Sequence, residues 1–530
     1  MTTMLLMKNI TKRFPGVLAN DRVSLDVREG EIHALVGENG AGKTTLMNVL
    51  YGLYQPDDGQ IFVRGREVRI CSPRDAISLG IGMIHQHFML VPAFTVAENV
   101  ALGLKSSKGI VLEMDSIRRR IEQLSAQYGL SMDSQAQVWQ LPVGVQQQAE
   151  ILKALIRGAE ILILDEPTGV LPPQEILRLF ATLRSFAAQG FSIIFISHKL
   201  KEVMEIGDRI TVLRQGRVIS TIKATDASVE ELARMMVGRD VNFAPQRKKP
   251  VLGDAVLRLS NLTVFDDRGV EALKDFSLEM YKGEILGVAG VQGSGQTELA
   301  EVLAGLRRCR SGHILLGNRD LTNAAPHTVI EAGLAYVPED RKRVGTIGTF
   351  SVAENSILKS HTRAPFAGKL LLRRRSIAEH ARCLVQEYDI RTHGIDVEAR
   401  TLSGGNLQKL ILAREVSRSA SVLVAMQPTR GLDIQATEFT HRKLLELRDS
   451  GMAVLLISAD LDEVLALSGR VAVLYEGRLM DVLPAELANK QSVGLLMAGI
   501  GGRRDGGTIE AEEKGHSHLG STHLRRGAGD

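Results

Sequence analysis

Short, mostly apolar runs alternate along the chain with longer segments in which apolar residues recur at helical spacing. The clearest short runs are residues 31–36, 161–164 and 192–196, and runs of this kind predict strands that are buried on both faces. Residues 44–51 and 146–157 carry the three- to four-residue spacing of helices. Buried strands separated by helices predict an α/β fold with a mainly parallel sheet.

This pattern occurs twice. Met-Lys-Asn-Ile-Thr at residues 7–11 returns as Leu-Ser-Asn-Leu-Thr at 259–263, an offset of 252. Residues 141–147 return at 402–408, so the offset has grown to 261, and it keeps that value toward the end of the second copy. A period of this length indicates a duplicated domain rather than a solenoid of small repeats.

The duplication predicts two domains, residues 4–239 and 255–500. Between them, residues 240–254 combine two prolines and a glycine with a cluster of Arg and Lys, which is typical of a linker. Residues 501–530 are rich in glycine and contain almost no large apolar side chains. Such a segment cannot bury enough apolar surface to fold, so we expect a disordered tail.

Composition narrows the class of protein. The chain is 44% hydrophobic and 24% charged, as in an ordinary globular protein. Its net charge is only +4, from 65 Lys and Arg and 61 Asp and Glu, and this small excess does not indicate nucleic acid as the main partner. Apolar runs such as 161–164 and 453–457 fall far short of the roughly 18 residues that a membrane-spanning helix needs. Cys71, Cys309 and Cys383 lack CxxC spacing, and no signal-peptide pattern follows Met1. We expect a chain in a reducing cytoplasm that does not cross the bilayer.

The first candidate chemistry is a phosphate-binding loop. Residues 37–44 read Gly-Glu-Asn-Gly-Ala-Gly-Lys-Thr and match G-x-x-x-x-G-K-[ST] between a predicted strand and a predicted helix. The glycines let backbone N–H groups turn toward phosphate, the helix N-terminus adds positive potential, Lys43 would reach the terminal phosphates, and Thr44 would hold Mg²⁺. A glycine-rich turn with a surface lysine is the alternative, and the flanking strand and helix disfavour it. The residues assigned to nucleotide are Gly37, Asn39, Gly40, Gly42, Lys43, Thr44 and Thr45.

Two acids follow the apolar run at 161–164. Asp165 and Glu166 would lie at the carboxyl edge of the sheet, beside the phosphate loop. There Asp165 would hold Mg²⁺ and Glu166 would polarise the attacking water. Two acids at a strand end would otherwise be read as helix caps, but the phosphate loop in the same copy favours the catalytic interpretation.

The order of these motifs resembles that of ABC-transporter ATPases. Leu-Pro-Val-Gly-Val-Gln-Gln at 141–147 precedes the acidic strand of the first copy, and Leu-Ser-Gly-Gly-Asn-Leu-Gln at 402–408 holds the same place in the second; both look like the family's signature motif. The resemblance extends over residues 4–499. It implies two tandem P-loop domains of the ABC type, each with a mainly parallel sheet core and a helical subdomain that carries the signature.

The resemblance also implies roles for three further residues of the first copy. Gln86 matches the loop glutamine that senses the membrane subunit and approaches Mg²⁺ and the attacking water. His198 matches the switch histidine that contacts the γ-phosphate. Phe14 is placed like the aromatic residue that stacks on adenine. Singly, each would more often be an ordinary core or surface residue, so they count only as members of the set.

In that family two domains pair head to tail, with ATP between the phosphate loop of one and the signature of the other. The resemblance therefore implies that the second copy completes the first copy's site. The contributing residues would be Ser403, Gly404 and Gly405 of the signature and Asp433 of the loop that follows the second copy's acidic-strand position.

The two copies have lost different residues. The second copy has Gln296 in place of Lys43, Met426 and Gln427 in place of Asp165 and Glu166, and Ala459 in place of His198. The first copy has a signature in which Pro142 replaces the serine and removes an N–H, and Pro172 stands where Asp433 stands in the second. In a head-to-tail pair these losses fall on the same site, so we expect one competent and one degenerate composite site.

The tandem fusion, the degenerate second loop and the run Ala-Met-Gln-Pro-Thr-Arg-Gly-Leu-Asp at 425–433 resemble the ATP-binding subunit of bacterial importers for simple sugars and nucleosides. The resemblance implies ATP and Mg²⁺ as cofactors and integral-membrane permease subunits as direct partners. It also implies an extracytoplasmic solute-binding protein as an indirect partner, a peripheral position on the cytoplasmic face of the membrane, and no nucleic-acid partner.

Two other classes remain as alternatives. A tandem ABC ATPase that acts on ribosomes or nucleic acid would also lack a membrane span, but such proteins usually have two working sites and a long basic linker. A non-hydrolysing nucleotide sensor conflicts with the complete set Lys43, Asp165, Glu166 and His198. Arginine runs at 118–120 and 373–375 could face lipid head groups or a permease, or form solvated helix faces.

Overall fold

The computed structural model describes residues 2–85, 88–104, 113–130, 132–169, 171, 173–240, 253–291, 293–368 and 371–501. The chain divides into two compact units, Met1–Ala244 with Gly431–Thr440, and Pro245–Arg430 with His441–Asp530. The predicted linker and tail lie almost wholly outside the described residues, as do Gln86 and Pro172. The domain boundaries given above therefore stay predictions.

The first domain opens with an antiparallel sheet. Its strands are β1 (Thr3–Phe14), β2 (Val17–Arg28), β4 (Asp58–Val63) and β5 (Arg66–Val68), in the order β2-β1-β4-β5. Along β2, Val23, Leu25 and Val27 are buried and alternate with more exposed residues. This period of two shows that the sheet packs one face on the core.

A second, six-stranded sheet forms the centre of the first domain, in the order β10-β9-β3-β8-β7-β6. The strands are β3 (Ile32–Val36), β6 (Ile81–Ile84), β7 (Ile161–Asp165), β8 (Ser192–Ile196), β9 (Arg209–Arg214) and β10 (Arg217–Lys223), and all but β10 run parallel. Every residue of β3, β7 and β8 is buried. The α/β prediction is thereby confirmed, because helices must cover both faces of such a sheet.

The helices of the first domain are α1 (Lys43–Leu50), α2 (Pro73–Ser78), α3 (Val96–Ala101), α4 (Met114–Tyr128), α5 (Val143–Ile156), α6 (Pro173–Ala188), α7 (Leu200–Ile206) and α8 (Val229–Val237). The helix predicted at 44–51 is α1, and the one predicted at 146–157 is α5, which begins three residues earlier. The prediction started α5 after Gly144, a poor helix former. In the structure Pro142 precedes the first turn with φ −54°, so the helix starts directly behind it.

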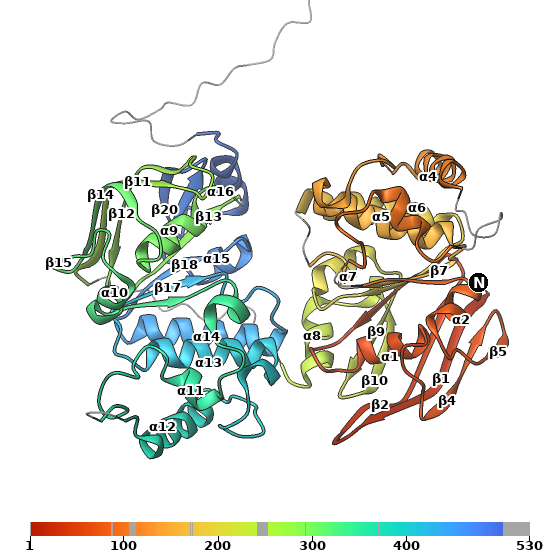
Figure 1. Cartoon of the computed structure of the whole chain (residues 1–530), viewed down its shortest axis with the longest axis horizontal. Coiled ribbons are helices and arrows are strands. Elements are labelled where there is room, and N and C mark those ends of the chain that lie inside the picture. The colour runs from red at the N-terminus through yellow and green to blue at the C-terminus, as the bar shows by residue number, and fades with distance from the viewer. Residues whose placement is uncertain are drawn as a thin grey trace, which may run out of the picture. The chain divides into compact units, whose positions relative to one another are not determined.

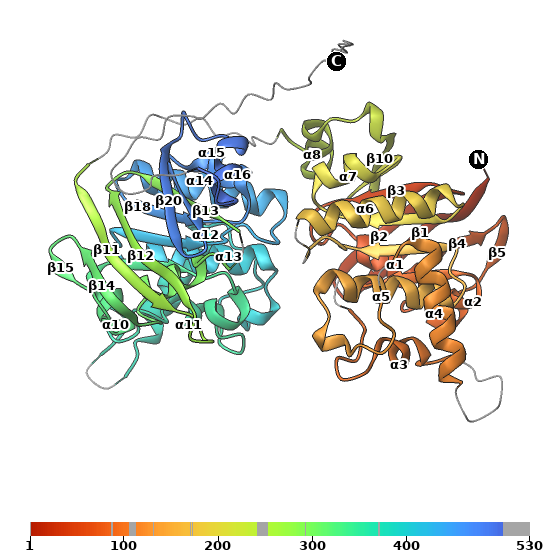
Figure 2. The same cartoon turned by 90° about the horizontal axis from the view of Figure 1, so that it is seen from above.

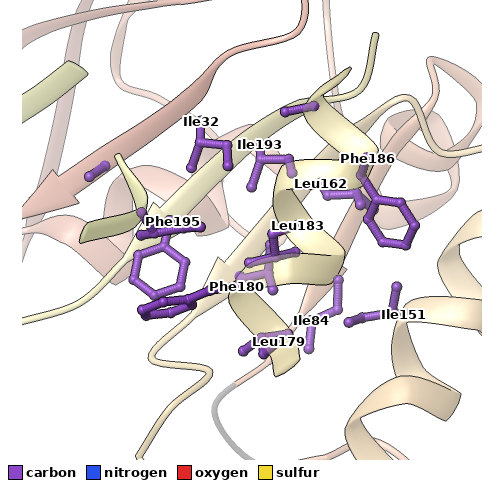
Figure 3. Packing of buried hydrophobic residues seen from close by; sticks show 14 of the residues in the cluster. Ile32, Ile84, Ile151, Leu162, Leu179, Phe180, Leu183, Phe186, Ile193 and Phe195 are labelled. Carbon is purple, nitrogen blue, oxygen red and sulfur yellow. The ribbon is translucent and has the colours of Figure 1, made fainter. Parts of the chain in front are cut away.

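One hydrophobic core of the first domain lies between α6 and the six-stranded sheet, along which α6 runs in Figure 2. Leu183 and Phe186 of α6 are fully buried, and Figure 3 shows them facing Ile193 and Phe195 of β8 together with Leu162 of β7. This packing fixes the carboxyl ends of β7 and β8, where the candidate catalytic residues stand.

The second domain, green to blue in Figure 1, repeats this architecture. Its antiparallel sheet has the order β12-β11-β14-β15, from β11 (Ala255–Phe265), β12 (Glu271–Tyr281), β14 (Cys309–Leu316) and β15 (Arg319–Asp320). Its six-stranded sheet has the order β16-β17-β18-β13-β19-β20, from β13 (Ile285–Gly290), β16 (Leu334–Val337), β17 (Val422–Met426), β18 (Ala453–Ile457), β19 (Arg470–Tyr475) and β20 (Arg478–Pro484). Each strand has a counterpart in the first domain, as the repeat predicts.

The helices of the second domain are α9 (Gln296–Leu303), α10 (Pro326–Ala332), α11 (Val352–Ser356), α12 (Arg374–Glu387), α13 (Gly404–Val416), α14 (Ile434–Asp449), α15 (Leu461–Leu467) and α16 (Lys490–Met497). Across the part of the chain that the structure describes, no helix combines the length and the apolar character needed to span a bilayer.

Candidate active site

The phosphate loop joins β3 to α1. Gly40 and Gly42 adopt φ values of 83° and 98°, which residues with a β-carbon rarely reach. A β-carbon at Gly42 would also lie 2.3 Å from the carbonyl oxygen of Ala19. The loop can therefore close tightly only with glycine at this position. Asn39 and Gly40 form its exposed rim, and Thr45 lies half-buried in the first turn of α1.

Lys43 lies folded into the loop that precedes it. Its Nζ donates hydrogen bonds to the carbonyl oxygens of Gly37, at 2.7 Å, and Glu38, at 3.0 Å, and the residue is only 6% exposed. Burial lowers the pKa of Lys43, and the nearby carboxylates of Glu166 and Asp165 oppose that shift. The ammonium is thus held at the concave side of the loop, where a phosphate would replace the carbonyl oxygens as its partner.

The structure brings together two of the three predicted magnesium ligands, Thr44 and Asp165, while the third, Gln86, lies outside the described residues. Asp165 is the last residue of β7, and its Oδ2 accepts a 3.5 Å hydrogen bond from Thr44 Oγ1 at the start of α1. Burial and the neighbouring charge of Glu166 raise the pKa of Asp165. One hydroxyl and one carboxylate fit Mg²⁺, which prefers oxygen ligands and takes few of them from the protein when phosphates and water supply the rest.

Glu166 and His198 form the second pair of the site. His198 Nδ1 lies 2.9 Å from Glu166 Oε1, and the two side chains are 15% and 17% exposed. Glu166 has a left-handed backbone with φ 47°, and its N–H donates to the carbonyl of Ile196 at the end of β8. Burial acts to raise the pKa of Glu166, but the hydrogen bond and charge of His198 outweigh it, so the pKa is lowered. The carboxylate is ionised and able to accept a proton.

The signature of the second domain begins α13. Ser403 is the N-cap residue, and its Oγ accepts hydrogen bonds from Asn406 N and Nδ2 at 3.4 and 2.9 Å. Gly404 and Gly405 form the first turn, whose N–H groups have no partner within the helix. Asp433 accepts a 2.8 Å hydrogen bond from the N–H of Ala436. The signature helix therefore offers an anion a positive N-terminus lined by glycine backbone.

Phe14 ends β1 and is half-buried. Its ring packs edge-on against Tyr54 with 5.3 Å between centroids, and Lys12 Nζ lies 5.6 Å from its centroid. Tyr54 was not predicted from the sequence, because this aromatic residue after α1 belongs to no motif. Phe14 thus comes with an aromatic support that would hold its ring in place for stacking on a flat base.

The second domain keeps the backbone of the site without its charges. Gln296 is 6% exposed, and its Nε2 lies 3.5 Å from the carbonyl oxygen of Val288, in place of the lysine contacts of the first domain. Gln427 has φ 47°, the same value as Glu166, and its N–H donates to Ile457. Its Oε1 accepts a hydrogen bond from the N–H of Ala459, where the first domain has His198. Met426, in the place of Asp165, is buried.

One further pair supports the site in each domain. Thr168 Oγ1 donates to Glu202 in the first domain, and Thr429 Oγ1 donates to Glu463 at 2.7 Å in the second. In the second domain His441 Nε2 also lies 3.0 Å from Glu463. These residues were not predicted from the sequence. The 261-residue offset could have indicated them, because it matches each threonine and each glutamate of one domain to the same residue type in the other. These hydrogen bonds connect the segment that follows β7 or β17 to the helix that follows the switch position, α7 or α15.

A model of the ABC transporter family matches residues 20–169 and 273–430 of this chain. The chain belongs to the ABC transporter family. As a member it is an ATP-binding ATPase of the transporter class.

Curated relatives align with nearly the whole of this ABC protein. The glucose import ATP-binding protein TsgD13 of Haloferax volcanii is 48% identical and covers 94% of this chain and 96% of its own. The nucleoside import ATP-binding protein NupA of Lactococcus lactis is 46% identical, covering 94% and 98%. The guanosine import ATP-binding protein NupO of Bacillus subtilis is 48% identical, covering 93% and 97%. The resemblance to the sugar and nucleoside import subunits is thereby confirmed.

Solved tandem structures share the fold of this ABC protein. An archaeal ribosome recycling factor in complex with a ribosomal stalk protein matches 93% of this chain and 92% of its own with a TM-score of 0.61 and 19% identity. A structure entitled RNase-L Inhibitor matches 93% of each chain with a TM-score of 0.59 and 19% identity. At this identity the similarity shows a shared fold.

Proposed function

We propose that this chain is the ATP-hydrolysing subunit of an importer for a small polar solute, either a simple sugar or a nucleoside. The names of its relatives, which specify import of glucose, nucleosides and guanosine, support this over 93–94% of the chain. The observation that supports hydrolysis is the assembly in one domain of a set suited to phosphoryl transfer to water: Lys43, Thr44, Asp165, Glu166 and His198.

Each side chain has a distinct task in the proposed reaction. Lys43 exchanges its loop carbonyls for the terminal phosphates of ATP, and Thr44 and Asp165 would hold Mg²⁺, which would neutralise charge on those phosphates. Glu166 accepts a proton from the attacking water. His198 holds Glu166 through Nδ1 and keeps Nε2 for the γ-phosphate.

The remaining residues bind the nucleotide or complete the site. Phe14 stacks on adenine, and the loop residues Gly37, Asn39, Gly40, Gly42 and Thr45 cradle the phosphates. Gln86, which lies outside the described residues, stays assigned to Mg²⁺, the attacking water and contact with the membrane subunit. Ser403, Gly404, Gly405 and Asp433 act from the second domain.

We infer that only one of the two composite sites hydrolyses ATP. In support, the second domain has neutral side chains at Gln296, Met426, Gln427 and Ala459, while its signature is capped by Ser403. The first domain has the opposite combination: its catalytic positions carry charged or titratable side chains, but no side chain caps its signature helix α5, because the N-cap residue is Pro142.

The proposed partners are permease subunits in the membrane, which the chain contacts from the cytoplasmic face as a peripheral protein. An extracytoplasmic solute-binding protein would act indirectly, and no nucleic acid takes part. We place the docking surfaces around Gln86 and around Glu339, its counterpart in the second domain. Glu339 is partly exposed and forms an ion pair with Arg430, so the second docking surface differs in charge from one built on a glutamine.

Reconstitution tests the proposed function. The chain would be expressed with candidate permease subunits, purified with them in vesicles, and assayed for uptake of labelled glucose, ribose, adenosine and guanosine together with phosphate release. We expect one solute class to raise ATP hydrolysis and to accumulate, and the Glu166→Gln chain to support neither. Hydrolysis that no solute in the panel stimulates, with no uptake, would contradict the proposal.

A further inference from the structure

A carboxylate from a neighbouring helix lies against the N-terminus of α5, the signature helix of the first domain. Glu175 lies in the first turn of α6, and its carboxyl group packs against the backbone of Gly144 in the first turn of α5. A β-carbon on Gly144 would lie 2.3 Å from Glu175 Oε2 and 3.2 Å from Oε1. Glycine at position 144 therefore leaves room for this carboxylate, although the signature around it has lost its serine.

Glu175 is partly buried, and its two carboxylate oxygens are in different surroundings. Glu175 Oε2 is shielded from solvent and accepts no hydrogen bond among the residues that the structure describes. Shielding a carboxylate oxygen in this way is unfavourable unless a hydrogen bond or positive potential compensates it. The positive potential nearest to this carboxylate comes from α5, a helix of 14 residues. Its first-turn N–H groups and its macrodipole make the N-terminus positive. No side chain caps α5, because its N-cap residue is Pro142.

The second domain differs at this place. The residue 261 positions after Glu175 is Ala436, which carries no charge. The equivalent signature helix, α13, is capped by the neutral hydroxyl of Ser403, and α14, the counterpart of α6, has no acidic residue in its first turn. The two signature helices therefore offer an incoming phosphate different electrostatic environments.

We propose that Glu175 keeps the terminal phosphate of a nucleotide away from the signature helix of the first domain, and so makes that signature unable to support a nucleotide site. The inference rests on the proposed assignment of one competent and one degenerate site. The carboxylate of Glu175 already lies against the first turn of α5, at the positive end of that helix. A phosphate brought to the same place meets a like charge at close range in a partly buried environment, where repulsion is strong.

Nucleotide binding tests this in a chain that cannot hydrolyse ATP. In the Glu166→Gln background, equilibrium dialysis with labelled ATP and Mg²⁺ gives the Kd of the tighter and the weaker site. We expect Glu175→Gln, which keeps shape and removes charge, to tighten the weaker site by about tenfold or more and to leave the tighter one unchanged. Glu122→Gln, on an exposed face of α4, is the matched control and should change neither. An unchanged weaker site overturns the inference.

A reciprocal pair tests the same charge in the second domain. Ala436→Glu places a carboxylate at the equivalent position, and Ala436→Gln adds the same volume without charge. We expect the glutamate variant to hydrolyse ATP at least about tenfold more slowly than the glutamine variant. Equal rates for the two overturn the inference, and this pair decides the matter should Glu175→Gln fail to fold. If the Glu166→Gln parent already binds two ATP molecules equally well, the asymmetry in the proposed function fails instead.

Discussion

Replacing Glu166 by glutamine should remove hydrolysis while leaving the fold and ATP binding intact. The structure contains a reference for this change, because Gln427 occupies the equivalent place in the second domain with the same φ of 47°. Its N–H makes the equivalent backbone hydrogen bond, to Ile457 where Glu166 bonds to Ile196. A glutamine therefore fits this backbone without strain beyond that already present, and any loss of rate is chemical.

The magnitude follows from what the amide cannot do. Glutamine cannot take up the proton of the attacking water, and it replaces the ionised partner that His198 contacts at 2.9 Å. Loss of one well-placed stabilising group costs about 2.7–4 kcal/mol, or roughly 10²- to 10³-fold in rate. Steady-state phosphate release at saturating Mg-ATP measures this loss, and dialysis with labelled ATP measures the retained binding.

The matched control is Gln427→Glu, which adds the carboxylate to the second domain. It should restore little activity, because Gln296, Met426 and Ala459 still surround it and groups that act as a unit do not contribute independently. Substantial turnover in Glu166→Gln, or a doubled rate in Gln427→Glu, would refute the assignment of one working site and the reasoning behind it.

Three further predictions follow from other parts of the chain. Ser403→Arg places a bulky cation at the cap of α13 and should lower phosphate release about as much as Glu166→Gln, whereas Ser403→Thr should retain most of it. Phe186→Ala removes a fully buried ring whose centroid lies 5.0 Å from that of Tyr128. The free energy of unfolding of the first domain, measured by urea titration, should fall by about 3–5 kcal/mol. Cysteines introduced near Gln86 and Glu339 should crosslink to the permease subunits in membranes; crosslinks that never reach a membrane protein would contradict the docking surfaces.

The sequence predicted those parts of the site that depend on local order along the chain. The strand before Asp165 and Glu166 is a continuous apolar run, and the phosphate loop has fixed spacing, so their elements followed directly. The start of α5 was missed, because Pro142 and Gly144 have opposite effects on a helix and only packing decides between them. The approach of Glu175 to Gly144 was missed as well, since it depends on how α6 lies against α5.

The left-handed residue at the end of β7 recurs at the end of β17, where the side chain is the neutral Gln427. Such a backbone costs about 1–2 kcal/mol for a residue with a β-carbon. Because Glu166 and Gln427 share it, this distortion comes from the way the chain leaves the central sheet, and it forms during folding of either domain. It is therefore a property of the scaffold and adds nothing to the proposed difference in turnover between the domains. The proposed difference in turnover therefore depends on the side chains alone, because the backbone conformation is shared. On this reasoning a domain could gain or lose catalysis by substitution without a change in its backbone.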